Sequence, residues 1–259
     1  MEKVKKPFYK KWWVWLLAFI IIGALASQGA EEDKAEPAST EPTSVEEESP
    51  EETNTDTEND NESDVETTVE DETNESEVTV ELTPQQQMFQ DIVSLMDSKQ
   101  AFDTGSYTKG DIPVGEYAFI QFDGSGQYFG EEDMAGNIID NENFDSFGYV
   151  YVHDAGNIQT QGALVNVEAF ETLGVSSAKE IYEIVNNVEN YKDSAWYKVG
   201  VDIPAGQYVI ESYGEGYVAI MSGPVGNNEI IDNEIFNGRY TVNVTDGQYL
   251  VISSGTIAQ

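Results

Sequence analysis

The acidic residues that could do chemistry occur in a short motif found twice in the chain. Residues 138–142 read Ile-Ile-Asp-Asn-Glu, and the same five residues recur at 230–234. Carboxylate oxygens could hold Ca²⁺, which takes six to eight oxygen ligands. The predicted calcium ligands are Asp140, Glu142, Asp232 and Glu234. An Asx-type turn is the alternative for each motif, because neither has the loop glycine or ligand spacing of an EF-hand.

Paired carboxylates could also catalyse glycoside hydrolysis, which uses two of them about 5–10 Å apart. Asp140, Glu142 and Asp145 are close in sequence, but 49 acidic residues against 12 basic ones make such neighbours common by chance. His153 is the only histidine, so the sequence offers no partners for a histidine-based metal site or catalytic triad. We therefore expect no enzymatic activity. A cell-wall hydrolase is the less favoured alternative.

A second candidate site combines aromatic and basic side chains, as a sugar-binding surface would. Tyr107 lies two residues before Lys109, and Trp196 and Tyr197 directly precede Lys198. The alternation of side chains along a strand buries about half of the many tyrosines. We expect Tyr107, Lys109, Trp196, Tyr197 and Lys198 to form an exposed ligand-binding patch.

These candidates lie in two similar β-rich stretches. Residues 197–208 read Tyr-Lys-Val-Gly-Val-Asp-Ile-Pro-Ala-Gly-Gln-Tyr, and a related run begins at Tyr107. Matching residues lie 91 or 92 positions apart along both stretches, which indicates duplication of one unit. The alternation of apolar residues predicts strands at 207–212 and 217–221, with a break between them.

Turn residues separate the expected strands of the second stretch. Asn237-Gly238 predicts a hairpin turn, because both central residues of a type I′ turn need positive φ. Asp246-Gly247 repeats the pattern before the strand expected at 248–253. Five or six short strands in about sixty residues predict a compact antiparallel sandwich or roll.

Each β-rich stretch follows a short amphipathic helix. Thr83-Pro84-Gln85-Gln86 predicts a helix start, with threonine as N-cap and proline at the first helical position. Ser177-Ala178-Lys179-Glu180 predicts a capping box for a second helix. The expected fold is therefore mainly β. It consists of two tandem helix-plus-β modules, at 83–175 and 176–259, in which each helix covers its own module.

Composition excludes several classes of protein. The formal net charge is −37, which would repel a phosphate backbone and excludes nucleic-acid binding. The chain contains no cysteine, which excludes disulfides and thiolate metal sites. Residues 31–82 hold 22 acidic residues and one lysine, with almost no large apolar residue. Such a segment cannot bury enough surface to fold, and we expect a disordered acidic stalk.

The N-terminus predicts a membrane anchor. Five lysines precede the uncharged run from Trp12 to Ala30, which is long enough to cross a bilayer. The positive-inside rule places residues 1–11 in the cytoplasm and the bulk of the chain outside. The alternative is a signal peptide cleaved near Ala26, which would secrete the remainder.

The run at 197–208, closed by Asp246-Gly247-Gln248-Tyr249-Leu250, resembles a β-rich module of exported, membrane-anchored proteins of Gram-positive bacteria. The resemblance covers about 83–259 and is weaker in the first copy, which lacks an aromatic residue equivalent to Tyr249. It implies location and fold rather than an activity. We expect a surface protein that binds cell-wall polymer or another surface protein. The alternative is a structural or calcium-dependent assembly protein.

Overall fold

The computed structural model describes residues 81–258, which belong to one compact unit. The predicted cytoplasmic tail, membrane anchor and almost all of the acidic stalk lie in residues 1–80, outside the described residues. Within 81–258, no helix combines the length and apolar character needed to cross a membrane. The described fold is mainly β with antiparallel sheets, as the sequence predicts.

Both predicted helices form, and each begins at its predicted cap. Helix α2 (Pro84–Asp97) starts with a capping box, in which Thr83 Oγ1 accepts from Gln86 N at 3.2 Å and Gln86 Oε1 accepts from Thr83 N at 3.0 Å. Helix α4 (Ala178–Asn186) is capped by Ser177, whose hydroxyl accepts from Glu180 N. A short turn η2 (Val167–Ala169) and helix α3 (Phe170–Leu173) were not predicted.

The first β-rich stretch divides into two four-stranded antiparallel sheets. In spatial order, the first sheet contains β1 (Ala101–Phe102), β8 (Ala163–Asn166), β3 (Gly115–Ile120) and β6 (Phe147–Val152). The second contains β2 (Gly105–Tyr107), β7 (Gly156–Thr160), β4 (Tyr128–Asp133) and β5 (Ile138–Asn143). The strands β6 and β5 are therefore outer strands of their sheets.

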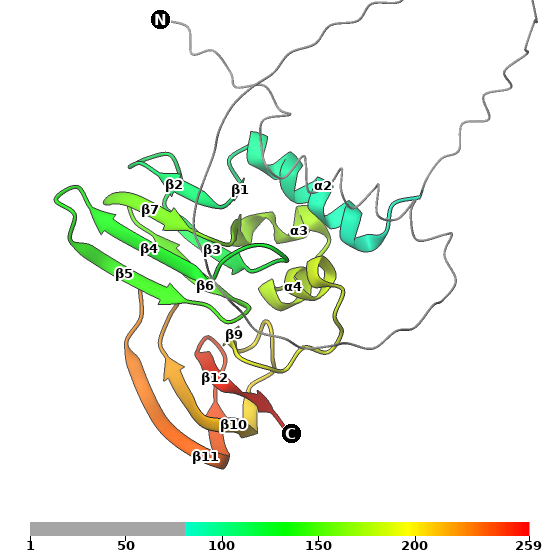
Figure 1. Ribbon diagram of the computed structural model, residues 1–259, viewed down its shortest axis with the longest axis vertical. Coiled ribbons are helices and arrows are strands. Elements are labelled where there is room, and N and C mark those ends of the chain that lie inside the picture. The colour runs from blue at the N-terminus through cyan, green and yellow to red at the C-terminus, as the bar shows by residue number, and fades with distance from the viewer. Residues whose placement is uncertain (1–80, 259) are drawn as a thin grey trace, which may run out of the picture. The chain divides into compact units, whose positions relative to one another are not determined.

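The second β-rich stretch forms a third sheet from fewer, longer strands. Its spatial order is β11 (Ile230–Val244), β10 (Gly206–Met221), β12 (Tyr249–Ile257) and β9 (Ala195–Lys198). In Figure 1, the strands β10, β11 and β12 lie below β4 and β5. The helices α2, α3 and α4 lie to the right of β4 and β5.

The hairpin predicted at Asn237-Gly238 is wrong, because both residues lie inside the continuous strand β11. Gly238 does have positive φ, at 82°. It lies opposite an irregularity in β10 between Glu211 and Glu215, where the register shifts. Ser212 Oγ accepts from Gly238 N at 2.8 Å and holds the two strands together there. The glycine therefore lets two paired strands bend together instead of reversing the chain.

The second helix packs mainly on the first sheet and not on the sheet of its own stretch, so that part of the prediction is wrong. Helix α4 packs against β3 and β6 of the first sheet and against α2. Strand β9 also packs against β6, and Val225, in the loop between β10 and β11, bridges Val150 of β6. The two predicted modules therefore share contacts along β6.

Aromatic side chains fill the junction between the first and third sheets. The rings of Phe119 and Phe144 stack with centroids 4.6 Å apart, and Phe144 meets the Trp196 ring edge-on at 6.0 Å. Phe147 contacts Tyr197 edge-on at 5.2 Å. Offset and edge-to-face rings of this kind add to the stabilisation from burial.

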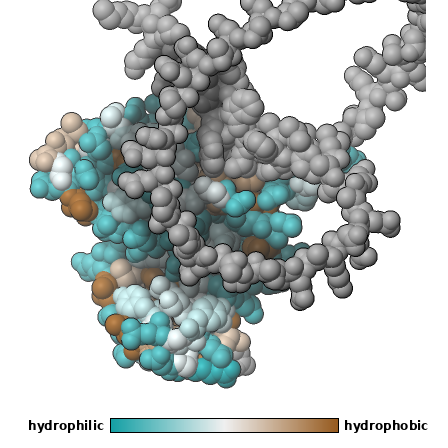
Figure 2. Space-filling model, viewed as in Figure 1, coloured by the Kyte–Doolittle hydropathy of each residue, from teal (hydrophilic) through white to brown (hydrophobic). Residues whose placement is uncertain are grey.

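The surface over the fold is mostly hydrophilic, with small apolar spots (Figure 2).

Candidate functional site

The predicted exposed patch of aromatic and basic residues does not form as a patch. Trp196 and Tyr197 are buried, and Tyr197 has no exposed surface. The expectation is wrong for these two residues because β9 is an outer strand whose side chains pack between two sheets instead of facing water. Tyr107 is half-buried, and Lys109 forms an exposed ion pair with Asp154 at 3.5 Å.

Lys198, the last member of the predicted patch, belongs to a polar cluster between the sheets. Its Nζ lies 2.6 Å from Glu116 Oε1, which also accepts from the Tyr249 hydroxyl at 2.9 Å. Burial and the neighbouring Glu116 raise the pKa of Tyr249. Because the carboxylate is shared by a cation and a phenol that stays protonated, this cluster holds the sheets together and leaves no free acid for chemistry.

A half-buried carboxylate lies beside this cluster. Asp202 accepts from the backbone N–H groups of Lys179 at 2.9 Å and Lys198 at 2.7 Å. Burial outweighs these bonds and raises the pKa of Asp202 to about 6. The carboxylate thus connects the start of α4 to β9, and its acidity depends on the fold.

His153 has a partner that the sequence did not reveal. The almost fully buried Glu131 accepts from His153 N at 2.9 Å, and its second oxygen lies 2.8 Å from His153 Nδ1. His153 directly follows β6 and is half-exposed, and its contact with Glu131 is one that the sequence did not predict. The two residues are 22 positions apart, and no local pattern could predict the contact because it depends on how β4 and β6 end.

The four predicted calcium ligands are divided between two outer strands. Asp140 and Glu142 lie on β5, and Asp232 and Glu234 lie on β11. Among residues 81–258, no group of three or more acidic or histidine side chains is placed to hold a metal ion. The structure therefore does not bring these four residues together.

Three of these residues bind backbone N–H groups of their own strands. Asp140 Oδ1 accepts from Asn141 N at 2.8 Å, and Glu142 Oε1 accepts from Asn143 N at 2.8 Å. Asp232 Oδ1 does the same for Asn233 N at 2.9 Å. Outer strands expose backbone groups that could pair with another chain, and polar side chains on the edge oppose such pairing. The repeated acidic motif thus caps two strand edges.

Beside β5 lies a slot formed by two adjoining cavities of about 240 and 170 Å³. We call it the β5 slot. Both cavities are lined by Glu142, Trp196, Tyr217 and Val251. Residues 140–143 and Asp145 form the wall on the β5 side. The opposite side is the face of the third sheet, so the slot runs between two sheets.

The floor of the slot follows the register of the third sheet. Ala219 of β10 pairs with Val251 of β12, and Val251 pairs with Trp196 of β9. These residues form one row across three strands, and their side chains share a face. Tyr217, two residues before Ala219 on the same face, is half-exposed. The floor is therefore apolar and aromatic.

The wall of the slot is acidic. Burial raises the pKa of Glu142, and the nearby charges of Asp140 and Asp145 raise it further. Within residues 81–258, no ion pair involves these three carboxylates. The slot therefore combines an apolar floor with negative charge that no cation in the described fold neutralises.

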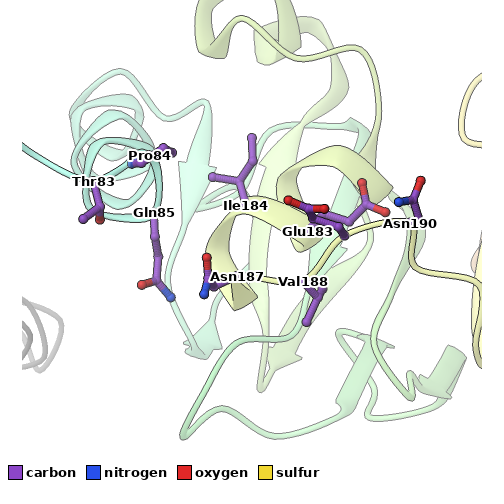
Figure 3. Close-up of a pocket in the computed structure, with 9 residues that line it drawn as sticks. Thr83, Pro84, Gln85, Glu183, Ile184, Asn187, Val188 and Asn190 are labelled. Atoms are coloured by element: carbon purple, nitrogen blue, oxygen red, sulfur yellow. The ribbon is translucent and has the colours of Figure 1, made fainter.

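A larger hollow of about 770 Å³ lies between the start of α2 and the end of α4. Figure 3 shows Gln85 reaching toward the end of α4, where its Nε2 donates to Val185 O at 2.6 Å. Glu183, also at this hollow, accepts from Lys179 Nζ and Tyr191 N. Because these polar groups already serve the helices, the hollow is the weaker candidate for a binding site.

No protein-family model matches the chain, and a search of curated proteins finds no similar sequence.

Proposed function

We propose that the chain is a membrane-anchored binding protein whose folded region lies outside the cell and takes its ligand in the β5 slot. The observation that carries this proposal is the slot itself, with its apolar floor and its unneutralised acidic wall. Pockets with an apolar lining and a few placed polar groups are the usual form of ligand sites. The ligand would be a cell-wall polymer or another surface protein.

The location is inferred from the sequence. The lysine-rich start and the uncharged run from Trp12 to Ala30 favour a single-pass anchor with a cytoplasmic N-terminus. The acidic residues at 31–82 would act as a solvated stalk that holds the folded region away from the bilayer. Binding rather than catalysis is proposed because the two carboxylates nearest Glu142 already serve the fold, since Asp140 accepts from Gly226 N and Asp145 accepts from the Ser253 hydroxyl.

The two β-rich stretches would derive from duplication of one helix-plus-β unit. Tyr107 and Tyr197 support this proposal, since each hydroxyl donates to the backbone carbonyl four residues earlier. Tyr117 and Tyr208 make the same contact with Pro113 O and Pro204 O. Only one of the two units would have kept a slot, because only β5 faces a third sheet.

The test is co-sedimentation of the full chain, kept in mild detergent, with purified Gram-positive cell walls. The double variant Glu142→Gln/Tyr217→Ala should reduce the apparent affinity about tenfold, or about 1.4 kcal/mol. The control is Glu234→Gln/Tyr213→Ala, which changes an acid of the other motif and an exposed tyrosine of the same strand β10. Equal pelleting of both variants would exclude the slot as the site, and pelleting lost only with a chelator would favour calcium-dependent assembly.

A further inference from the structure

We propose that the ligand of the β5 slot is an extended peptide segment with alternating basic and apolar side chains, which adds to β5 as an extra strand. This inference rests on the proposed function, since it requires the slot to be the binding site. It goes further by naming the class of ligand and the mode of binding.

The edge of β5, and not one of its faces, borders the slot. Among the strands of residues 81–258, β5 pairs with β4 on one side and with no strand on the other. Four consecutive residues, 140–143, line the slot. Consecutive side chains of a strand point to opposite faces, so a face alone would contribute only alternate residues. The slot therefore runs along the free backbone edge.

The pattern of hydrogen bonds shows which backbone groups point into the slot. Phe144 N donates to Gln127 O of the partner strand at 2.9 Å. In an antiparallel pair every second residue makes such bonds. The backbone N–H and C=O groups of Glu142 and Asp140 therefore point toward β4. The N–H groups of Asn141 and Asn143 then point outward, and they donate to the carboxylates of Asp140 and Glu142.

These carboxylate caps are local and can be replaced by an incoming strand. The carbonyl groups of a peptide would accept from Asn141 N and Asn143 N, as in other cases of strand addition. The carboxylate of Glu142 would then be free to bind a cationic side chain of the same peptide, and Asp140, whose Oδ2 also accepts from Gly226 N at 2.6 Å, would add its negative charge. Charge and backbone pairing thus favour the same ligand.

The fold already contains one example of strand addition, on the outer strand of the first sheet. Val225 N donates to Tyr149 O at 3.0 Å, and Tyr151 N donates to Val225 O at 2.7 Å. The loop between β10 and β11 therefore occupies the edge of β6. The N–H groups on the edge of β5, by contrast, are covered by the strand's own side chains.

The shape of the slot favours a peptide over a glycan. Sugars stack on exposed aromatic faces, but Trp196 keeps only 7% of its surface exposed at the floor. Residues 140–143 of β5 span roughly 13 Å at about 3.3 Å per residue, enough for a short strand. The apolar side chains of such a strand would contact Tyr217 and Val251, and its basic side chains would meet Asp140 and Glu142.

The test uses fluorescence anisotropy of a labelled heptapeptide of alternating lysine and valine, titrated with the full chain in mild detergent. A second probe has the same sequence and charge but carries N-methyl groups on its backbone, which cannot pair with a strand. We expect the methylated probe to bind at least about tenfold more weakly. Glu142→Gln should weaken the first probe severalfold and Glu234→Gln should not.

Three results would overturn the inference. Equal binding of the two probes would mean that charge alone attracts the peptide. A chitosan tetramer that binds with dependence on Glu142, while the peptide does not, would assign the slot to a glycan and leave the proposed function standing. Loss of cell-wall pelleting in the slot variant without binding of any peptide probe would overturn the peptide ligand and its mode of binding, and would leave the proposed function standing.

Discussion

Lys198 and Glu116 are 82 residues apart in the sequence, yet Lys198 Nζ lies 2.6 Å from Glu116 Oε1. The ion pair joins β9 of the third sheet to β3 of the first. About a fifth to a quarter of each side chain is exposed, and the ammonium also lies 5.4 Å from the centre of the Tyr149 ring. The pair therefore lies where the two β-rich stretches meet, and its loss should loosen that junction.

Lys198→Met should lower the free energy of unfolding by about 1–3 kcal/mol, because it leaves the half-buried Glu116 without its cation. Urea unfolding followed by circular dichroism measures the change. The double variant Lys198→Met/Glu116→Gln should recover part of the loss. The control is Lys109→Met, which breaks the exposed pair with Asp154 and should cost less than about 0.5 kcal/mol. Equal costs at the two sites would contradict burial as the cause.

Asp202 should make stability depend on pH in the direction opposite to most carboxylates. Its pKa is raised to about 6 from 3.8, so the folded protein binds more protons than the unfolded chain between these values. The free energy of unfolding contributed by this group is then greatest below about pH 4 and is lost as the pH rises through 6. Asp202→Asn should remove this dependence.

The measurement for Asp202 is urea unfolding of both proteins at pH 4, 5, 6 and 7. The stability of the unmodified protein, relative to Asp202→Asn, should decrease steadily as the pH rises. Parallel pH profiles would show that the carboxyl group ionises as freely in the fold as in the unfolded chain.

Local patterns account for what the sequence predicted correctly. The capping box at Thr83 and the serine cap at Ser177 involve residues within one helical turn, so spacing alone identifies them. The break expected at 214–216 and the hairpin at Asn237-Gly238 were local readings as well. Both predictions failed because a glycine with positive φ can form a bend within two paired strands as well as a turn that reverses the chain. Only the register of β10 and β11 distinguishes a bend from a turn.

The candidate site could not be predicted because it depends on contacts between distant strands. The sequence identified Glu142 and Trp196 as candidates, but for separate sites. The slot brings them together only because β5 of the second sheet borders β9 of the third. Similarly, Glu131 appeared as one acid among many, and its burial beside His153 follows from the ends of β4 and β6.

Tyr197→Phe should cost about 1 kcal/mol in the free energy of unfolding. Its hydroxyl donates to Asp193 O at 2.6 Å inside the fold, and the variant leaves that carbonyl without this donor. Tyr208→Phe removes the same kind of contact, to Pro204 O at 2.7 Å, at an exposed position. Water can replace that bond, so the cost should stay below about 0.5 kcal/mol. Chemical denaturation of the two variants should therefore give clearly different midpoints, and matching midpoints would count against the role of burial.

Gly226→Ala should destabilise the contact between the β10–β11 loop and β6. The cost should exceed the strain that alanine suffers at a positive φ, because the added Cβ would also collide with β6. Gly226 has φ of 90°, and an added Cβ would lie 2.6 Å from Tyr151 O. Its N–H also donates to Asp140 Oδ2 at 2.6 Å, so displacement of the loop would disturb the wall of the β5 slot as well.

Gly136→Ala is the matched control for this variant. Gly136 has a similar φ of 82°, but a Cβ added there would meet no atom of residues 81–258 within 4 Å. The control should cost about 1–2 kcal/mol from backbone strain, and Gly226→Ala should cost clearly more. Hydrogen exchange at Tyr151 N, which donates to Val225 O, should accelerate only in Gly226→Ala. If both variants left that amide equally protected, the loop would not depend on its close approach to β6.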